Sequence, residues 1–201
     1  MSKQVYVSAD YDSSNGDQAV VEELVKWGKD DKHKVSFVEM SNPSSGSVSD
    51  GDDCCICDLK KEFNSQINAS SAVIFVVGDM TKYRIAGSGC DRNNKDWYEC
   101  YCTPYKQNAN GKKLCKWSST TSATNGDVGN INSYSYLRHE FEQSKKKGKS
   151  IIIVYNSTRY ESSWLPSYMD DYEDNAVPFW TQDANGNKVG NYSYIKEALG
   201  F

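Results

Sequence analysis

Apolar residues along the chain follow two spacings, one typical of buried strands and one typical of helices with a single buried face. Short runs of β-branched and aromatic residues predict strands at residues 5–8, 35–38, 72–77, 150–155 and, from a weaker pattern, 176–180. Apolar residues three or four apart predict helices that end near residue 28 and that cover about 56–70, 135–145 and 194–199. Strands and helices therefore alternate along the sequence.

This alternation predicts an α/β fold built on an open parallel sheet of about five strands, with helices on both faces. The runs at 72–77 and 151–155 are almost continuously apolar, which is typical of parallel strands buried on both faces. We expect a single domain spanning residues 1–201. Residues 85–132 are rich in Gly, Asn, Ser, Thr and Lys, and we interpret them as a long insertion between the third strand and the following helix.

In such sheets, ligands bind beyond the carboxyl ends of the strands, where the direction of winding changes. We therefore expect the residues that bind a ligand to lie in the segments that follow the first three predicted strands. These segments are residues 10–16, 41–53 and 81–133.

Charge and hydropathy narrow the classes of partner. The formal net charge of −4 argues against an extended basic surface for nucleic acid, and the lysines at 145–149 are better explained as the end of a helix. The longest apolar runs are far shorter than the roughly 20 residues of a membrane-spanning helix. The first residues lead directly into a predicted strand without the apolar segment of a signal peptide, so we expect a cytoplasmic protein with neither membrane nor nucleic acid among its partners.

The helix predicted at 135–145 carries the most distinctive pair of side chains. Tyr136 and Glu140 are four residues apart, so both lie on one side of the helix. An aromatic ring beside a carboxylate suits the binding of a sugar ring and the stabilisation of positive charge on it, whereas a surface glutamate packed on a tyrosine is the alternative explanation. Glu99 is a weaker candidate, because it lies in the insertion and has no aromatic partner one helical turn before it.

The cysteines offer a second possible site. Seven is an odd number, so a complete set of disulfides is excluded, and in a reducing compartment most should be free thiols. Four cysteines of the insertion provide enough thiolates for zinc, but their spacing differs from the paired CxxC pattern of zinc sites, and we therefore expect no metal. These residues are Cys90, Cys100, Cys102 and Cys115.

Four blocks, in this order, resemble the TIR domain superfamily, most closely the bacterial TIR-like proteins of Thoeris anti-phage defence. The blocks are the first strand and its loop at 4–12, a helix and strand at 58–78, the pattern Tyr-x-x-x-Glu-Phe at 136–141, and the turn into the next strand at 148–153. The resemblance covers roughly half of the chain. It implies a three-layer, flavodoxin-like fold.

The resemblance also implies an activity, because enzymatic TIR domains cleave the bond between nicotinamide and ribose in NAD. Their essential glutamate corresponds to Glu140, and Tyr136 would stack on a ring of the substrate. Ser8, Asp10 and Tyr11 would line the nicotinamide and ribose side of the cleft. NAD would be the substrate, with no further cofactor. The product would be ADP-ribose or a cyclic isomer that signals to a partner effector protein, and the enzyme could act as a homo-oligomer.

Two other functions fit the same pattern. A non-catalytic TIR-type module would only bind other proteins. An enzyme similar to nucleoside deoxyribosyltransferases would use the carboxylate on the N-glycosidic bond of a nucleoside.

Overall fold

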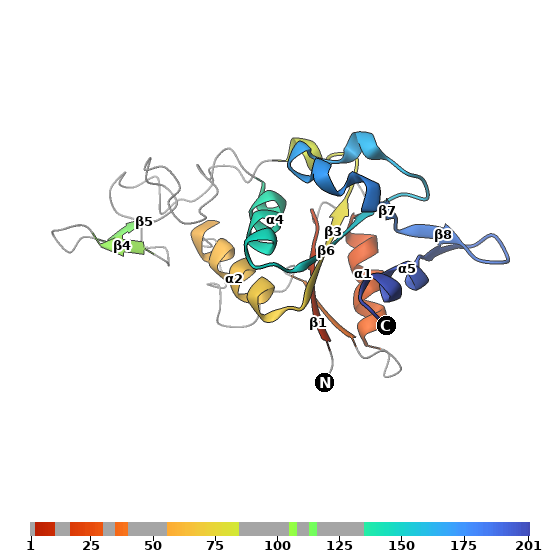
Figure 1. Ribbon diagram of the computed structural model, residues 1–201, viewed down its shortest axis with the longest axis horizontal. Helices are drawn as coiled ribbons and strands as arrows, with labels where there is room; N and C mark the ends of the chain where they lie inside the picture. Colours follow the sequence, from red (N-terminus) through yellow and green to blue (C-terminus); the bar gives the residue numbers. More distant parts are fainter. Residues whose placement is uncertain are drawn as a thin grey trace.

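A parallel sheet of five strands organises the protein (Figure 1). The computed structural model describes residues 3–10, 17–29, 35–39, 56–84, 105–107, 113–115 and 135–201. The strands of the sheet are β1 (Lys3–Ser8), β2 (Val35–Glu39), β3 (Ala72–Val77), β6 (Ser150–Tyr155) and β7 (Val177–Pro178). Their order is β2-β1-β3-β6-β7, so the winding changes direction between β1 and β3, and the predicted α/β sheet is confirmed.

Helices cover both faces of this sheet. They are α1 (Asp17–Gly28), α2 (Ile56–Ala69), α4 (Tyr136–Lys146) and α5 (Tyr192–Ala198). Helices α1 and α5 lie against one face, and α2 and α4 lie against the other (Figure 1). The helices predicted from spacing are therefore confirmed, with boundaries that differ by one or two residues.

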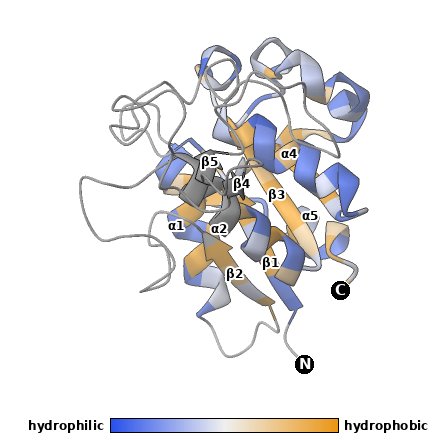
Figure 2. Cartoon of the chain, turned by 90° about the vertical axis from the view of Figure 1, so that its left-hand side faces the viewer, coloured by the Kyte–Doolittle hydropathy of each residue, from blue (hydrophilic) through white to orange (hydrophobic). Residues whose placement is uncertain are grey.

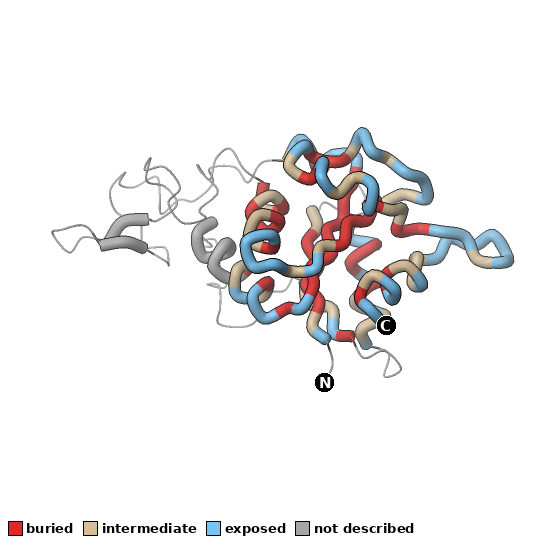
Figure 3. The backbone as a smooth tube through the Cα atoms, in the orientation of Figure 1, coloured by how far each residue is buried: buried red, intermediate tan, exposed pale blue. Residues whose placement is uncertain are grey.

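The core forms because successive side chains of a strand point to opposite faces. All six residues of β3 are buried, and β3 is hydrophobic along its length (Figure 2). Ile74 and Val76 pack with α1 and α5, whereas Val73 and Phe75 pack with α2 and α4. The strands are buried between helices whose outer surfaces are exposed (Figure 3).

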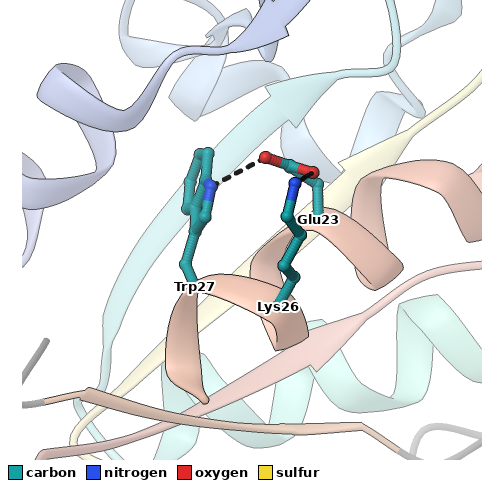
Figure 4. Close-up of polar contacts among 3 residues, drawn as sticks. All are labelled: Glu23, Lys26 and Trp27. Atoms are coloured by element: carbon teal, nitrogen blue, oxygen red, sulfur yellow. Dashed lines mark hydrogen bonds and ion pairs between the residues drawn. The ribbon is translucent and has the colours of Figure 1, made fainter. Parts of the chain in front are cut away.

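Helix α1 is fixed to its face of the sheet by Trp27. The Trp27 ring stacks on Phe179 at a centroid distance of 5.6 Å, and its Nε1 donates a hydrogen bond of 2.8 Å to Glu23, which also pairs with Lys26 (Figure 4). A Cβ atom at Gly190 would lie 2.6 Å from the Trp27 ring, so only glycine fits at that position.

The segment after β6 departs from the prediction. A single strand over residues 176–180 is wrong in its extent, because only Val177 and Pro178 join the sheet and Trp180 begins a separate hairpin. Pro178 lacks the N–H group that a strand interior needs, which confines it to a short edge strand. The hairpin consists of β8 (Trp180–Gln182) and β9 (Lys188–Gly190).

Short 3-10 helices complete the described structure. One, Thr81–Tyr83, follows β3, and two others, Ser162–Trp164 and Ser167–Asn175, connect β6 to β7 where the sequence pattern predicts no helix. Within the predicted insertion, β4 (Tyr105–Gln107) and β5 (Lys113–Cys115) pair antiparallel, and its other residues lie outside the described ones. Across the described residues, no helix has the length and apolar character that crossing a membrane requires.

Candidate functional site

The carboxylate of Glu140 lies against β1 near the carboxyl end of that strand. Its side chain is only 4 % exposed. The Tyr6 hydroxyl donates a hydrogen bond of 2.7 Å to Oε1, and the Ser8 hydroxyl donates a hydrogen bond to Oε2. Tyr6 and Ser8 are two residues apart on a strand, so both side chains leave β1 on the face that α4 covers. Two of the predicted site residues, Glu140 and Ser8, are thus in direct contact.

Helix α4 holds Glu140 in this position. Ser135 caps the helix, since its hydroxyl accepts a 3.0 Å hydrogen bond from the Arg138 N–H. Leu137 and Phe141 are buried in the core beneath α4, and the Ser144 hydroxyl donates to the Glu140 carbonyl oxygen at 2.7 Å. Glu140 is therefore on the buried side of the helix, unlike a glutamate on the protein surface.

The surroundings of Glu140 raise the pKa of its carboxyl. Burial raises the pKa of this carboxyl to about 7, while the hydrogen bonds from Ser8 and Tyr6 act in the opposite direction and the negative charge of Asp10 adds to the rise. A carboxyl with a pKa near the working pH can both hold a negative charge and accept a proton.

A second buried carboxyl, Asp17, lies at the start of α1. It is 0 % exposed, and Asn156, which follows β6, donates a hydrogen bond of 3.1 Å to its Oδ1. The Trp180 indole donates to Asn156 at 2.8 Å and fixes the orientation of that amide. Gly78, directly after β3, is required here because a Cβ atom would lie 2.5 Å from the Asp17 carboxylate.

Asp17 also titrates near neutrality. Burial raises its pKa to about 7, with the Asn156 hydrogen bond opposing the shift and the charges of Asp10 and Asp79 adding to it. Its Oδ2 is buried without a hydrogen-bond partner among the described residues, an arrangement that suits a protonated carboxyl. Sequence reasoning did not select Asp17 or Asn156. Asn156 could have been selected by its position, because it directly follows the carboxyl end of β6, whereas Asp17 begins α1 and carries no such signal.

Asp10 connects the two carboxyls. It follows β1, and its negative charge raises the pKa of both Glu140 and Asp17. Asp10 therefore interacts with both buried carboxyls at the carboxyl end of the sheet, where the winding changes direction. This is the end of the sheet at which the sequence predicts a ligand site.

Tyr136 lies one turn before Glu140, at the start of α4. Its ring packs edge-on against Phe63 of α2, with the centroids 5.5 Å apart and the ring planes at 74°. The use of this half-buried ring as a stacking surface for a substrate stays a prediction. Tyr11, the remaining predicted site residue, lies outside the described residues, as do 41–53 and Cys90, Cys100 and Cys102.

A cavity of about 420 Å³ opens beside the start of α4. Its basic lining residues are Lys82, Arg84 and Arg138, and its hydroxyl groups include those of Thr81, Ser135 and Tyr168. Burial raises the pKa of the Tyr168 hydroxyl above its usual range; the Asp10 and Glu140 charges add to this effect, and Ser135 and Arg138 oppose it. Tyr168 thus lines the cavity, and the charges of Asp10 and Glu140 act on its pKa.

The described residues form no cluster of three histidine, cysteine or acidic side chains arranged to hold a metal ion. His139, which neighbours Glu140, is buried, and its Nε2 lies 2.9 Å from the Asn64 amide oxygen of α2. This contact ties α4 to α2.

Comparisons of the chain with protein-family models, with curated protein sequences and with solved structures find no match.

Proposed function

We propose that this chain is a TIR-like enzyme that cleaves NAD into nicotinamide and an ADP-ribose product, linear or cyclic. The observation that carries the proposal is the buried Glu140 carboxylate, held by Tyr6 and Ser8 at the carboxyl end of the sheet. The strand order β2-β1-β3-β6-β7, which is that of flavodoxin-like folds, also supports the TIR resemblance.

The chemistry requires a fixed negative charge. When the N-glycosidic bond breaks, its electron pair leaves with nicotinamide, which becomes neutral, and positive charge develops on the ribose. The Glu140 carboxylate stabilises this charge. Tyr6 and Ser8 already donate to both carboxylate oxygens, so ribose hydroxyls can replace one of these donors when the substrate binds.

The second half of the reaction needs a nucleophile and a proton acceptor. Water gives linear ADP-ribose, and its proton passes to a carboxylate; a group of the substrate itself gives a cyclic isomer. A carboxyl with a pKa of about 7 suits the role of acceptor near neutral pH. In this mechanism Tyr136 stacks on a ring of the substrate, and Asp10 and Tyr11 line the nicotinamide and ribose side of the site.

The resemblance to Thoeris proteins gives the proposal its biological setting. The enzyme acts in the cytoplasm during anti-phage defence, and its nucleotide product reaches a partner effector protein. Assembly into a homo-oligomer is part of this proposal, because TIR enzymes act in assemblies.

Incubation of the purified protein with NAD, followed by chromatography for nicotinamide, tests the proposal. We expect release of nicotinamide from NAD and no transfer of deoxyribose from a deoxynucleoside to a free base. The reverse result would favour the deoxyribosyltransferase alternative. A protein that turns over neither substrate at any concentration, while its mass by light scattering rises with concentration, would favour the non-catalytic module.

A further inference from the structure

The cavity beside α4 stands out because of its charge. Three basic residues line it, Lys82, Arg84 and Arg138, and none of the described residues lining it is acidic. The protein as a whole carries a net charge of −4, so this local excess of positive charge does not reflect its composition. Such a cavity attracts anions.

The basic residues come from two parts of the chain. Lys82 and Arg84 belong to the turn that follows β3, and Arg138 lies in the first turn of α4. Contacts within the protein orient two of them, since Lys82 donates to the Ser163 carbonyl at 2.6 Å and the Arg138 guanidinium lies 5.4 Å from the Tyr168 ring centre. Both groups have several N–H donors, so each can also bind an anion.

The hydroxyl groups of Thr81, Ser135 and Tyr168 add polar groups to the same wall. The volume of about 420 Å³ falls within the usual range for small-molecule sites, roughly 300–1,000 Å³. The cavity therefore has room for more than one phosphate group. Arginines that can bind two oxygens at once are the side chains best suited to phosphates.

One lining residue, Tyr168, relates the cavity to Glu140. Arg138 and Glu140 are two residues apart on α4, so their side chains leave the helix on different sides. Tyr168 links the two places, because it lines the cavity and responds to the charges of both Arg138 and Glu140.

We propose that this cavity is the diphosphate subsite of the enzyme and that Arg138, together with Arg84 and Lys82, binds the two phosphate groups of the dinucleotide. This inference rests on the proposed function for the identity of the substrate, although diphosphate binding by the cavity can be measured on its own. The enzyme then selects nucleotides that contain a diphosphate over nucleosides and monophosphates.

Isothermal titration calorimetry with inorganic pyrophosphate, inorganic phosphate, ADP-ribose and adenosine tests the subsite. We expect pyrophosphate and ADP-ribose to bind, and Arg138→Gln to weaken both by about tenfold or more. Lys82 is exposed, so Lys82→Gln provides a second variant if Arg138→Gln fails to fold. It should weaken the binding of pyrophosphate and of ADP-ribose several-fold. Lys196→Gln on the exposed face of α5 is the matched control and should bind like the wild type.

The outcomes separate this inference from the proposed function. Pyrophosphate binding that depends on Arg138 in a protein without NAD turnover would support the subsite and contradict the enzyme. NAD turnover with an unchanged KM in Arg138→Gln would support the enzyme and overturn the subsite. Equal affinities for inorganic phosphate and pyrophosphate, or binding that Arg138→Gln and Lys82→Gln both leave unchanged, would also overturn it.

Discussion

The Tyr6 hydroxyl lies 2.7 Å from Oε1 of Glu140, a contact between residues that are 134 positions apart in the sequence. It joins the strand at the centre of the winding change to the helix that follows the predicted insertion. Because Ser8 donates to the other oxygen of the same carboxylate, both oxygens are bound by side chains of β1. The proposed activity of Glu140 depends on this arrangement.

Tyr6→Phe should change both the titration of Glu140 and the stability of the fold. Its hydrogen bond favours the charged carboxylate, so its loss should raise the pKa of Glu140 further above about 7. The acid limb of the pH–rate profile for NAD cleavage should then move to higher pH. Urea unfolding should show a loss of about 1–3 kcal/mol, because a buried acceptor loses its donor.

Tyr83→Phe provides the control for the unfolding measurement. Its side chain is 64 % exposed, and the substitution should change the free energy of unfolding by less than about 0.5 kcal/mol. An unchanged pH–rate profile in an active Tyr6→Phe enzyme would show that this hydroxyl does not tune the carboxyl.

The raised pKa of Asp17 should make the stability of the fold depend on pH. Its pKa is about 7 in the folded protein, above the ordinary value of 3.8, so the folded state binds the proton more tightly than the unfolded state does. Between these two values the free energy of unfolding contributed by Asp17 falls as the pH rises, and above about 7 it stays at its lower level. Glu140 contributes in the same direction because its pKa is also raised.

Asp17→Asn should remove one of these two contributions. Urea unfolding at pH 5 and pH 8 measures the difference in stability between the two conditions for each protein. We expect the loss of stability on going from pH 5 to pH 8 to be smaller in the variant, by up to an amount on the order of 3 kcal/mol. Identical pH dependence in the variant and the wild type would mean that Asp17 titrates normally.

Gly78→Ala should destabilise the fold through Asp17. The added methyl group would lie 2.5 Å from Oδ1 of that carboxylate, too close for any contact, and relief requires movement of α1 or β3. We expect a loss of about 1–3 kcal/mol. In an Asp17→Ala background the same substitution should cost clearly less, and a double-mutant cycle without such coupling would contradict the contact.

The sequence predicted the elements whose pattern is purely local. Ala72–Val77 is apolar without interruption, so its burial on both faces needed no further information. The 3-10 helix Ser167–Asn175 has only Met169 buried, and one buried residue gives no periodicity to detect. Pro178 explains why the last strand is shorter than the apolar run predicted.

The candidate site was predictable only in part. Glu140 could be selected from its spacing to Tyr136, and Ser8 from its place at the end of the first strand. Tyr6 could have been inferred from Ser8, since residues two apart on a strand share a face. Asp17 could not, because an acidic residue in the first turn of a helix is usually exposed, and its burial depends on Gly78 and Asn156 from distant parts of the chain.

The most direct test of the central claim is nicotinamide release from NAD by the wild type, Glu140→Gln and Glu142→Gln, each assayed at pH 8 over a range of protein concentrations. Glu142 lies on the same helix and its substitution removes the same charge, so it controls for general effects on α4. The account predicts release by the wild type and by Glu142→Gln at similar rates, and a decrease of at least about 100-fold in Glu140→Gln. Release by Glu140→Gln at the wild-type rate would contradict it.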